Sequence, residues 1–227
     1  MVNIKYVYDL VNDLADKNNG RYIDGEEFTR YAQTSNNELF DELIGATNLR
    51  ANRQSRVVIG VSQDLDSRLK PFRDSATVSV VEGEASVPEN CRKILNVLTS
   101  KRNPKALIRL DDDRVGMIFG NPLREPDEDD IYYVDGYKNL EVFGNIDSIY
   151  INYLRSPISP VYAEKEEVIT SGSREVTRKV YDPDNSVDFE WDEPQTLDLV
   201  VRILQKAGIP MKDNFIEQMS GVLRNQE

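Results

Sequence analysis

The chain has 227 residues, with 28 Lys plus Arg against 40 Asp plus Glu, a formal net charge of −12, and 39% hydrophobic residues. This balance is typical of a globular protein and allows one large domain or two small ones. The sequence has no histidine and a single cysteine, which excludes Ser-His-Asp and Cys-His catalysis, histidine-ligated metals, an intrachain disulfide and a thiolate zinc cluster.

Two helices are predicted in the first fifty residues. Apolar residues at three- and four-residue spacings predict the first over residues 4–14. Asp24 with Glu27 three residues later forms a capping-box pattern, which starts a second helix that we expect to end at Gly45. A shorter helix is predicted over residues 62–70.

From about residue 76 the hydrophobic period changes to that of β-strands, and the separators are rich in Asn, Asp, Gly and Pro. The predicted strands are residues 77–81, 91–98, 105–110, 114–119, 130–134, 139–143 and 147–154. Short strands with short links indicate a central antiparallel β-sheet or a small sandwich. Residues 161–181 are predicted to form a separate, highly charged β-hairpin, which is marginal unless it rests on another surface.

The last segment returns to helix. An apolar stripe predicts one helix from Pro194 to Gly208, and Asp213 is expected to cap a final helix. This order of elements indicates an α+β fold in which the N- and C-terminal helices pack together. The expected parts are a helical part over 1–75, a β domain over 76–160, a projecting hairpin arm with an acidic linker over 161–190, and C-terminal helices over 191–227.

The negative charge is concentrated in two segments. Residues 111–130 hold eight acids and two bases, and residues 181–198 hold seven acids and no base, so the other 189 residues sum to −12 + 6 + 7 = +1. Such a balance argues against a nucleic-acid binder, because binding to phosphate backbones depends on clustered Lys and Arg. Solvated loops are the simplest interpretation of both segments.

Three groups of residues raise the question of metal binding or catalysis. Residues 16–27 resemble a calcium-binding EF-hand loop, but Gly20 and Arg21 stand where a ligand and the turn glycine belong, so an interhelical turn is expected. The run Asp111-Asp112-Asp113 and the acids of residues 125–130 are expected at the tip of a β-turn, since adjacent carboxylates on a strand point to opposite faces. Cys91 lies in an apolar strand pattern and is expected to be a buried hydrophobe.

Phe189 and Trp191 lie among acids, and two interpretations stay open. They could seal the junction between the β domain and the helices, or they could be the centre of an interface with an acidic rim.

Three groups of short motifs follow one another along most of the chain. They are Gly20-Arg21-Tyr22-Ile23 with Glu27-Phe28 and Glu38-Leu39-Phe40-Asp41-Glu42-Leu43; Ile149-Tyr150-Ile151-Asn152-Tyr153-Leu154-Arg155-Ser156-Pro157; and Tyr181-Asp182-Pro183 with Ser186-Val187-Asp188-Phe189-Glu190-Trp191, Ile203-Leu204 and Ala207-Gly208-Ile209. As a set they resemble the neck proteins, or head–tail connector ring proteins, of crAss-like tailed bacteriophages that infect Bacteroidetes.

The resemblance implies a non-enzymatic virion structural protein, a portal adaptor subunit that forms a homo-oligomeric, dodecameric ring between portal and tail. Its partners would be other copies of itself, the phage portal and further neck or tail proteins, with no cofactor and no membrane. It would be assembled in the host cytoplasm and located in the neck of the virion. DNA would pass through the ring without specific binding, which anionic or neutral walls favour because they do not hold phosphates.

The expected site residues follow from these interpretations, with no catalytic or metal residue among them. Expected at interfaces are Tyr153, Leu154, Arg155, Pro157, Phe189, Trp191, Phe215, Ile216, Met219 and Leu223. A second hypothesis places on the channel side the acids Asp111, Asp112, Asp113, Asp127, Glu128, Asp129 and Asp130. A calcium-binding EF-hand-like interaction module, or less favourably a carboxylate-dependent hydrolase, remains the alternative function.

Overall fold

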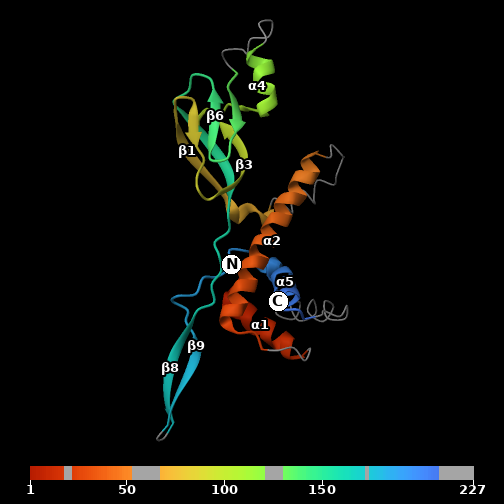
Figure 1. Cartoon of the computed structure of the whole chain (residues 1–227), viewed down its shortest axis with the longest axis vertical. Helices are drawn as coiled ribbons and strands as arrows, with labels where there is room; N and C mark the ends of the chain where they lie inside the picture. The colour runs from red at the N-terminus through yellow and green to blue at the C-terminus, as the bar shows by residue number, and fades with distance from the viewer. Residues whose placement is uncertain (18–21, 53–66, 121–129, 172–173, 210–227) are drawn as a thin grey trace. The chain divides into compact units, whose positions relative to one another are not determined.

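The computed structural model describes residues 1–17, 22–52, 67–120, 130–171 and 174–209, and its fold is α+β, as the sequence predicts (Figure 1). Contacts divide the chain into two compact units. We call Met1–Pro71 with Pro157–Glu227 the helical unit, and Phe72–Ser156 the β unit. The predicted final helix after Asp213 and most of the predicted helix 62–70 lie outside the described residues.

The helices and strands of the helical unit that the structure describes in full are α1, α2, α5 and the two strands of a β-hairpin. Their bounds are α1 Ile4–Lys17, α2 Gly25–Asn52, α5 Thr196–Lys206, β8 Glu164–Ser171 and β9 Arg174–Tyr181, with a 3-10 turn η2 at Glu193–Gln195. The apolar stripe that predicts α1 is buried, and so is that of α5. α5 packs against both α1 and α2, so the predicted contact between the N- and C-terminal helices is confirmed. Ion pairs join α5 to α2, between Arg202 and Glu42 and between Lys206 and Glu38.

Helix α2 begins directly after Asp24, as predicted, but it does not end at Gly45. A glycine inside a helix costs about 1 kcal/mol relative to alanine, which is too little to stop a helix whose neighbours favour it. Glycine ends a helix when it takes a left-handed conformation, and Gly45 stays within the helix.

The β unit contains seven strands and one helix. Their bounds are β1 Arg73–Val81, β2 Glu84–Ser86, β3 Cys91–Leu98, β4 Ile108–Leu110, α4 Asp112–Phe119, β5 Tyr132–Asp135, β6 Asn139–Phe143 and β7 Ser148–Arg155, after a 3-10 turn η1 at Lys70–Phe72. The strand order is β3-β7-β1-β2-β6-β5-β4. Every neighbouring pair is antiparallel except β4 with β5. The sheet is therefore mixed and not antiparallel throughout, because α4 lies in a crossover that returns the chain in the same direction.

The two ends of this sheet are joined. The backbone N–H of Leu107 donates to the carbonyl of Val97 at 2.9 Å, and Leu98 forms a β-bridge with Ala106. The sheet thus curves round its own buried cluster instead of pairing with a second sheet as a sandwich would. That cluster consists of Ala85, Val97, Leu107, Tyr133, Leu140, Val142, Ile149, Ile151 and Tyr153.

Residues 114–119, predicted as a strand, belong to helix α4. Carboxylates at the start of a helix interact favourably with its dipole, and Asp112 and Asp113 lie in the first turn of α4. The ring of Phe119 lies 4.9 Å from that of Phe143 and 5.8 Å from that of Tyr132, which ties the helix to β6 and β5. The prediction failed because a short apolar run does not distinguish a strand from a helix.

Candidate functional site: the root of the β8–β9 hairpin

The strands of the β8–β9 hairpin contact mainly each other. Its strands pair in register from Glu164 with Tyr181 to Ser171 with Arg174, as a two-stranded sheet of their own. The side chains of residues 165–168 and 177–179 are exposed. Figure 1 shows both strands running away from α1 and α2. A two-stranded hairpin is marginally stable alone. Contacts at its root, where it joins the helices, must therefore stabilise it.

Four aromatic rings pack together at this root. Tyr162, 8% exposed, stacks on Tyr8 of α1 with ring centroids 4.0 Å apart. The ring of Tyr181, the last residue of β9, lies 5.1 Å from that of Tyr162. Phe28 of α2 meets Tyr8 edge-on at 5.1 Å. Each such pair contributes about 1 kcal/mol beyond the area it buries.

The phenol group of Tyr8 is held in hydrogen bonds. The hydroxyls of Tyr8 and Tyr22 share a hydrogen bond of 2.6 Å, and the Tyr8 hydroxyl also lies 3.2 Å from the carbonyl oxygen of Ile23. Burial is the largest cause that raises the pKa of Tyr8 and of Tyr162 above the ordinary value for tyrosine. Both side chains therefore stay protonated at neutral pH and act as structural groups.

Three polar side chains of α2 bind the extended segment that leads into β8. Thr29 Oγ1 donates to the carbonyl of Tyr162 at 3.3 Å and accepts the N–H of the same residue at 3.1 Å. Gln33 Nε2 donates to the carbonyl of Pro160, and Asn36 Nδ2 to that of Ile158, each at 3.2 Å. Spacings of four and three residues on a helix face match steps of two residues along an extended chain. We call these hydrogen bonds from Thr29, Gln33 and Asn36 the ladder of α2. They determine where the hairpin leaves the helices.

Gly25 allows the hairpin to approach the first turn of α2. A Cβ atom at this position would lie 2.8 Å from the carboxyl carbon of Glu164 and 3.0 Å from Cδ1 of Tyr162. The absence of a side chain lets the Glu164 carboxylate lie beside the N-terminus of α2, where the helix dipole favours negative charge. Lys179 Nζ of β9 lies 3.7 Å from the same carboxylate.

A tight turn closes the other side of the root, after β9. The carboxylate of Asp182 accepts from Asn185 Nδ2 at 2.7 Å and from the N–H of Asp184 at 3.2 Å. Ser186 Oγ donates to the carbonyl of Asp182 and accepts the N–H of Ala163. The hydrogen bond from Asn185 is the largest cause that lowers the pKa of Asp182 below its ordinary value.

The acidic segment 181–198 is tied into the fold and is not simply a solvated loop. Besides the turn at Asp182, Asp188 Oδ1 accepts the N–H of Ile4 at 2.8 Å, at the first turn of α1. Glu190 Oε2 accepts the N–H of Ile158 at 2.7 Å. Three of its acids therefore accept hydrogen bonds from backbone N–H groups.

The acids of residues 111–130 divide into two groups. Asp111 precedes α4 and Asp112 and Asp113 begin it, all three exposed. They start a helix, and the prediction of a β-turn tip is wrong. Asp130 is half-buried just before β5, and Asp127, Glu128 and Asp129 lie outside the described residues.

Five of the ten predicted interface residues are buried within the chain. Tyr153 belongs to the core of the β unit, and Leu154 and Pro157 are also buried. Phe189 and Trp191 are fully buried. These five side chains are packed inside the folded chain, and their role at an interface stays a prediction.

Phe189 and Trp191 belong to the segment before α5, which binds α2 and the N-terminal residues of the helical unit. Trp191 Nε1 donates to Asn36 Oδ1 at 2.6 Å, and Phe189 forms a β-bridge with Val2. Burial of these two rings stabilises the helical unit itself.

The other predicted interface residues fall outside this core. Arg155 is half-exposed, with its guanidinium 5.9 Å from the centre of the Phe72 ring. Phe215, Ile216, Met219 and Leu223 lie outside the described residues. For these five positions the interface role stays a prediction.

Residues considered for chemistry have structural roles where they are described. Burial raises the pKa of the half-buried Cys91, which disfavours the thiolate. Glu27 Oε1, in the EF-hand-like segment, accepts the hydroxyl of Tyr31 at 2.7 Å, while residues 18–21 lie outside the description. Within the described ranges no group of three or more acids or cysteines is placed to hold a metal ion.

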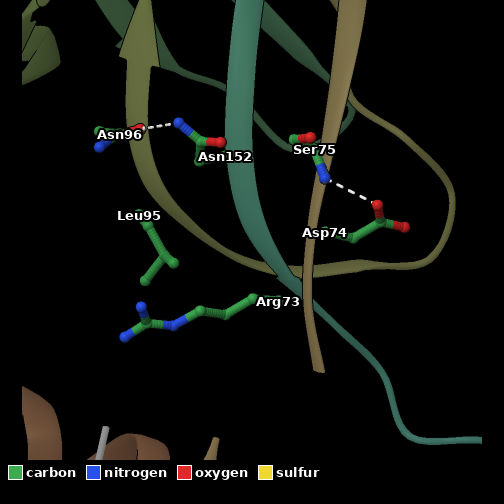
Figure 2. A pocket seen from close by; sticks show the side chains of 6 residues that line it. All are labelled: Arg73, Asp74, Ser75, Leu95, Asn96 and Asn152. Carbon is green, nitrogen blue, oxygen red and sulfur yellow. Dashed lines mark hydrogen bonds between the residues drawn. The ribbon is translucent and has the colours of Figure 1, made fainter. Parts of the chain in front are cut away.

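A shallow pocket of about 420 Å³ opens on the outer face of β1, β3 and β7 (Figure 2). It is lined by Arg73, Asp74, Ser75, Leu95, Asn96 and Asn152. Asn152 Nδ2 donates to Asn96 Oδ1 at 2.6 Å, and the N–H of Ser75 donates to the Asp74 carboxylate. The two Asn side chains thus bind each other across neighbouring strands, and the Asp74 carboxylate binds the backbone of its own strand, which supports a structural role.

Sequence reasoning predicted the hairpin but missed its root. Thr29, Gln33 and Asn36 are the available signal, because polar residues at this spacing lie beside an apolar helical stripe. No helix in the part of the chain that the structure describes is long and apolar enough to span a membrane. Comparison of the chain with protein-family models and with curated proteins found no match.

Proposed function

We propose that the chain is a non-enzymatic virion structural protein, a head–tail connector subunit that assembles with copies of itself into a ring between portal and tail. The observation that carries this proposal is the β8–β9 hairpin. The side chains of residues 165–168 and 177–179 are exposed, yet the root is fixed by stacked tyrosines and by the hydrogen bonds from α2. Such an element adds little to the stability of a single chain. In a subunit that assembles with copies of itself, it provides an arm that can contact a neighbouring subunit.

The motif resemblance supports the same conclusion at the residues the structure describes. Phe28 and Tyr181 lie in the aromatic root, Asp182 makes the turn that closes it, and Trp191 is bound by Asn36 of α2. Several of the residues that carry the resemblance thus lie in the hairpin root or beside it. We infer that the shared feature of such neck proteins and this chain is the positioning of this arm.

Among the acids predicted on the channel side, those at the start of α4 are the exposed ones in the part of the chain that the structure describes. Asp111, Asp112 and Asp113 are exposed, and a surface with three adjacent carboxylates repels the phosphates of a passing duplex. Reversal of their charge to Lys should slow release of DNA from particles, measured as ejection kinetics. Unchanged kinetics with normal incorporation would remove these residues from the channel.

Mass spectrometry of purified phage particles tests the proposed function directly. The proposal predicts that the full chain is present in many copies per particle and co-purifies with portal and neck components after mild disruption. Absence of the chain from mature particles would contradict it. Turnover of a substrate by the isolated monomer would equally contradict it.

A further inference from the structure

Both long edges of the β8–β9 hairpin are free. β8 pairs with β9 on one side, and within the described ranges no third strand pairs with either. Each outer edge is a row of backbone N–H and C=O groups that can template a further strand. Natural proteins protect such edges or use them to bind another chain by strand addition.

The two edges carry opposite charge. Residues 164–168 of β8 hold three carboxylates and one ammonium, Glu164, Glu166, Glu167 and Lys165, for a net charge of −2. Residues 177–181 of β9 hold Arg178 and Lys179 and no acid, for a net charge of +2. Glu166 stands opposite Lys179 in the register, and Glu167 opposite Arg178.

This asymmetry decides which edges of two copies can meet. A contact of β8 with another β8, or of β9 with another β9, would place like charges side by side, which is unfavourable for cross-strand neighbours. A contact of β9 with the β8 of a second copy repeats the charge pairs that already exist inside the hairpin. Copies related by a rotation axis also bring these two edges together antiparallel, in the same sense as within one hairpin.

We propose that β9 of one copy adds along its free edge to β8 of the next copy, and that this head-to-tail contact builds the ring. The inference rests on the proposed function, which it makes specific by naming the partner as a second copy of this chain. Backbone hydrogen bonds supply the affinity, while the charges select the partner edge. A contact between two different patches can repeat round a closed ring, whereas a contact between identical patches gives only a dimer.

Site-specific cross-linking tests the contact in the full chain. In a Cys91→Ser background, one chain carries Val168→Cys on β8 and a second, differently tagged chain carries Thr177→Cys on β9. Val168 is 58% exposed and stands opposite Thr177 in the register, so both positions accept a thiol. A short bismaleimide should give several times more covalent dimer with the mixture than with either chain alone. As much dimer from either single chain, or none from the mixture, would overturn the proposal.

Charge reversal provides a second, independent readout. Arg178→Glu and Lys179→Glu together with Glu166→Lys and Glu167→Lys on the Thr177→Cys chain keep the charge pairs within its own hairpin. They should lower the yield with the Val168→Cys chain, because two acidic edges then meet. The same four changes on that partner should restore the yield, because the two edges are again complementary. If the yield stays low after the second reversal, the charges do not select this contact and the proposal fails.

The outcomes also separate this inference from the proposed function. A chain that is present in virions but gives no β8–β9 cross-link keeps its structural role and loses this contact. A chain that cross-links as expected but is missing from virions keeps the contact and loses the proposed role.

Discussion

Gly25 and Gly45 lie in the same helix, and their surroundings differ. A methyl group on Gly25 would press on Glu164 and Tyr162, whereas no heavy atom lies within 4 Å of a Cβ at Gly45. The absence of a side chain thus makes room for the hairpin at Gly25, whereas at Gly45 glycine only lowers helix stability. The pair isolates the contribution of the hairpin root to stability.

Gly25→Ala should lower the free energy of unfolding by about 1 kcal/mol, because the Glu164 carboxylate must leave the N-terminus of α2. Gly45→Ala should raise it by about 0.5–1 kcal/mol, through helix propensity alone. Urea unfolding of both variants measures the difference. The same cost for Gly25→Ala in a Glu164→Ala background would show that this contact is not the cause.

Asp182 gives the root a dependence on pH. Its pKa is lowered in the folded chain, so its contribution to stability is present above the unfolded pKa and is lost as the pH falls through the folded pKa. Asp182→Asn should therefore destabilise the protein more at neutral pH than at about pH 3. Urea unfolding at both pH values measures this, with the exposed Asp184→Asn as control. A stability difference that is constant with pH would contradict the prediction.

At the scale of elements, α2 has two functions in the helical unit. One face packs against α5, and Thr29, Gln33 and Asn36 on another part of its surface bind the chain that enters β8. The exit of the hairpin is therefore set by a helix that is distant in sequence. An isosteric substitution of one of these three side chains should weaken the hydrogen bonds at the root without disturbing the helix.

Thr29→Val removes a hydroxyl that satisfies both the N–H and the carbonyl of Tyr162. It should cost about 1–3 kcal/mol in free energy of unfolding, because buried backbone groups lose their partner. Thr34→Val is the matched control, since Thr34 is exposed and its hydroxyl bonds only to the Arg30 carbonyl one turn earlier. It should change stability by less than about 0.5 kcal/mol. Equal effects of the two changes would contradict the ladder's role.

Much of the element list could be predicted from the sequence, because periodicity and turn residues are local signals. The stripe of α1, strands such as Asn139–Phe143, and the two strands of the hairpin belong to this class. The parallel pairing of β4 with β5 and the helix at Asp112–Phe119 could not be predicted, since each depends on packing against distant strands. The aromatic root lay beyond sequence reasoning for the same reason, because Tyr8 and Tyr162 meet only in the folded chain.

At the scale of the whole molecule, the chain consists of two units with separate cores. The β unit closes its sheet on itself round its own apolar cluster, and the helical unit packs α5 on α1 and α2. Each unit therefore satisfies most of its backbone and apolar groups internally, which is the condition for independent folding.

A fragment spanning residues 72–156 should accordingly fold alone and unfold cooperatively. Thermal unfolding followed by circular dichroism measures this, with Leu140→Asp as control because Leu140 is fully buried in the cluster. The control should abolish the transition, since an unpaired charge in the core is costly. A fragment without a cooperative transition would show that the β unit depends on the helical unit.

The central claim is that the hairpin is an assembly arm held by its root, and incorporation into phage particles tests it most directly. A chain in which a two-residue Asn-Gly turn replaces residues 167–178 keeps the root and loses most of both strands. The shortened chain should fold with nearly unchanged stability yet be missing from purified particles, whereas a chain with Gly45→Ala is incorporated normally. Normal incorporation of the shortened, folded chain would contradict the account.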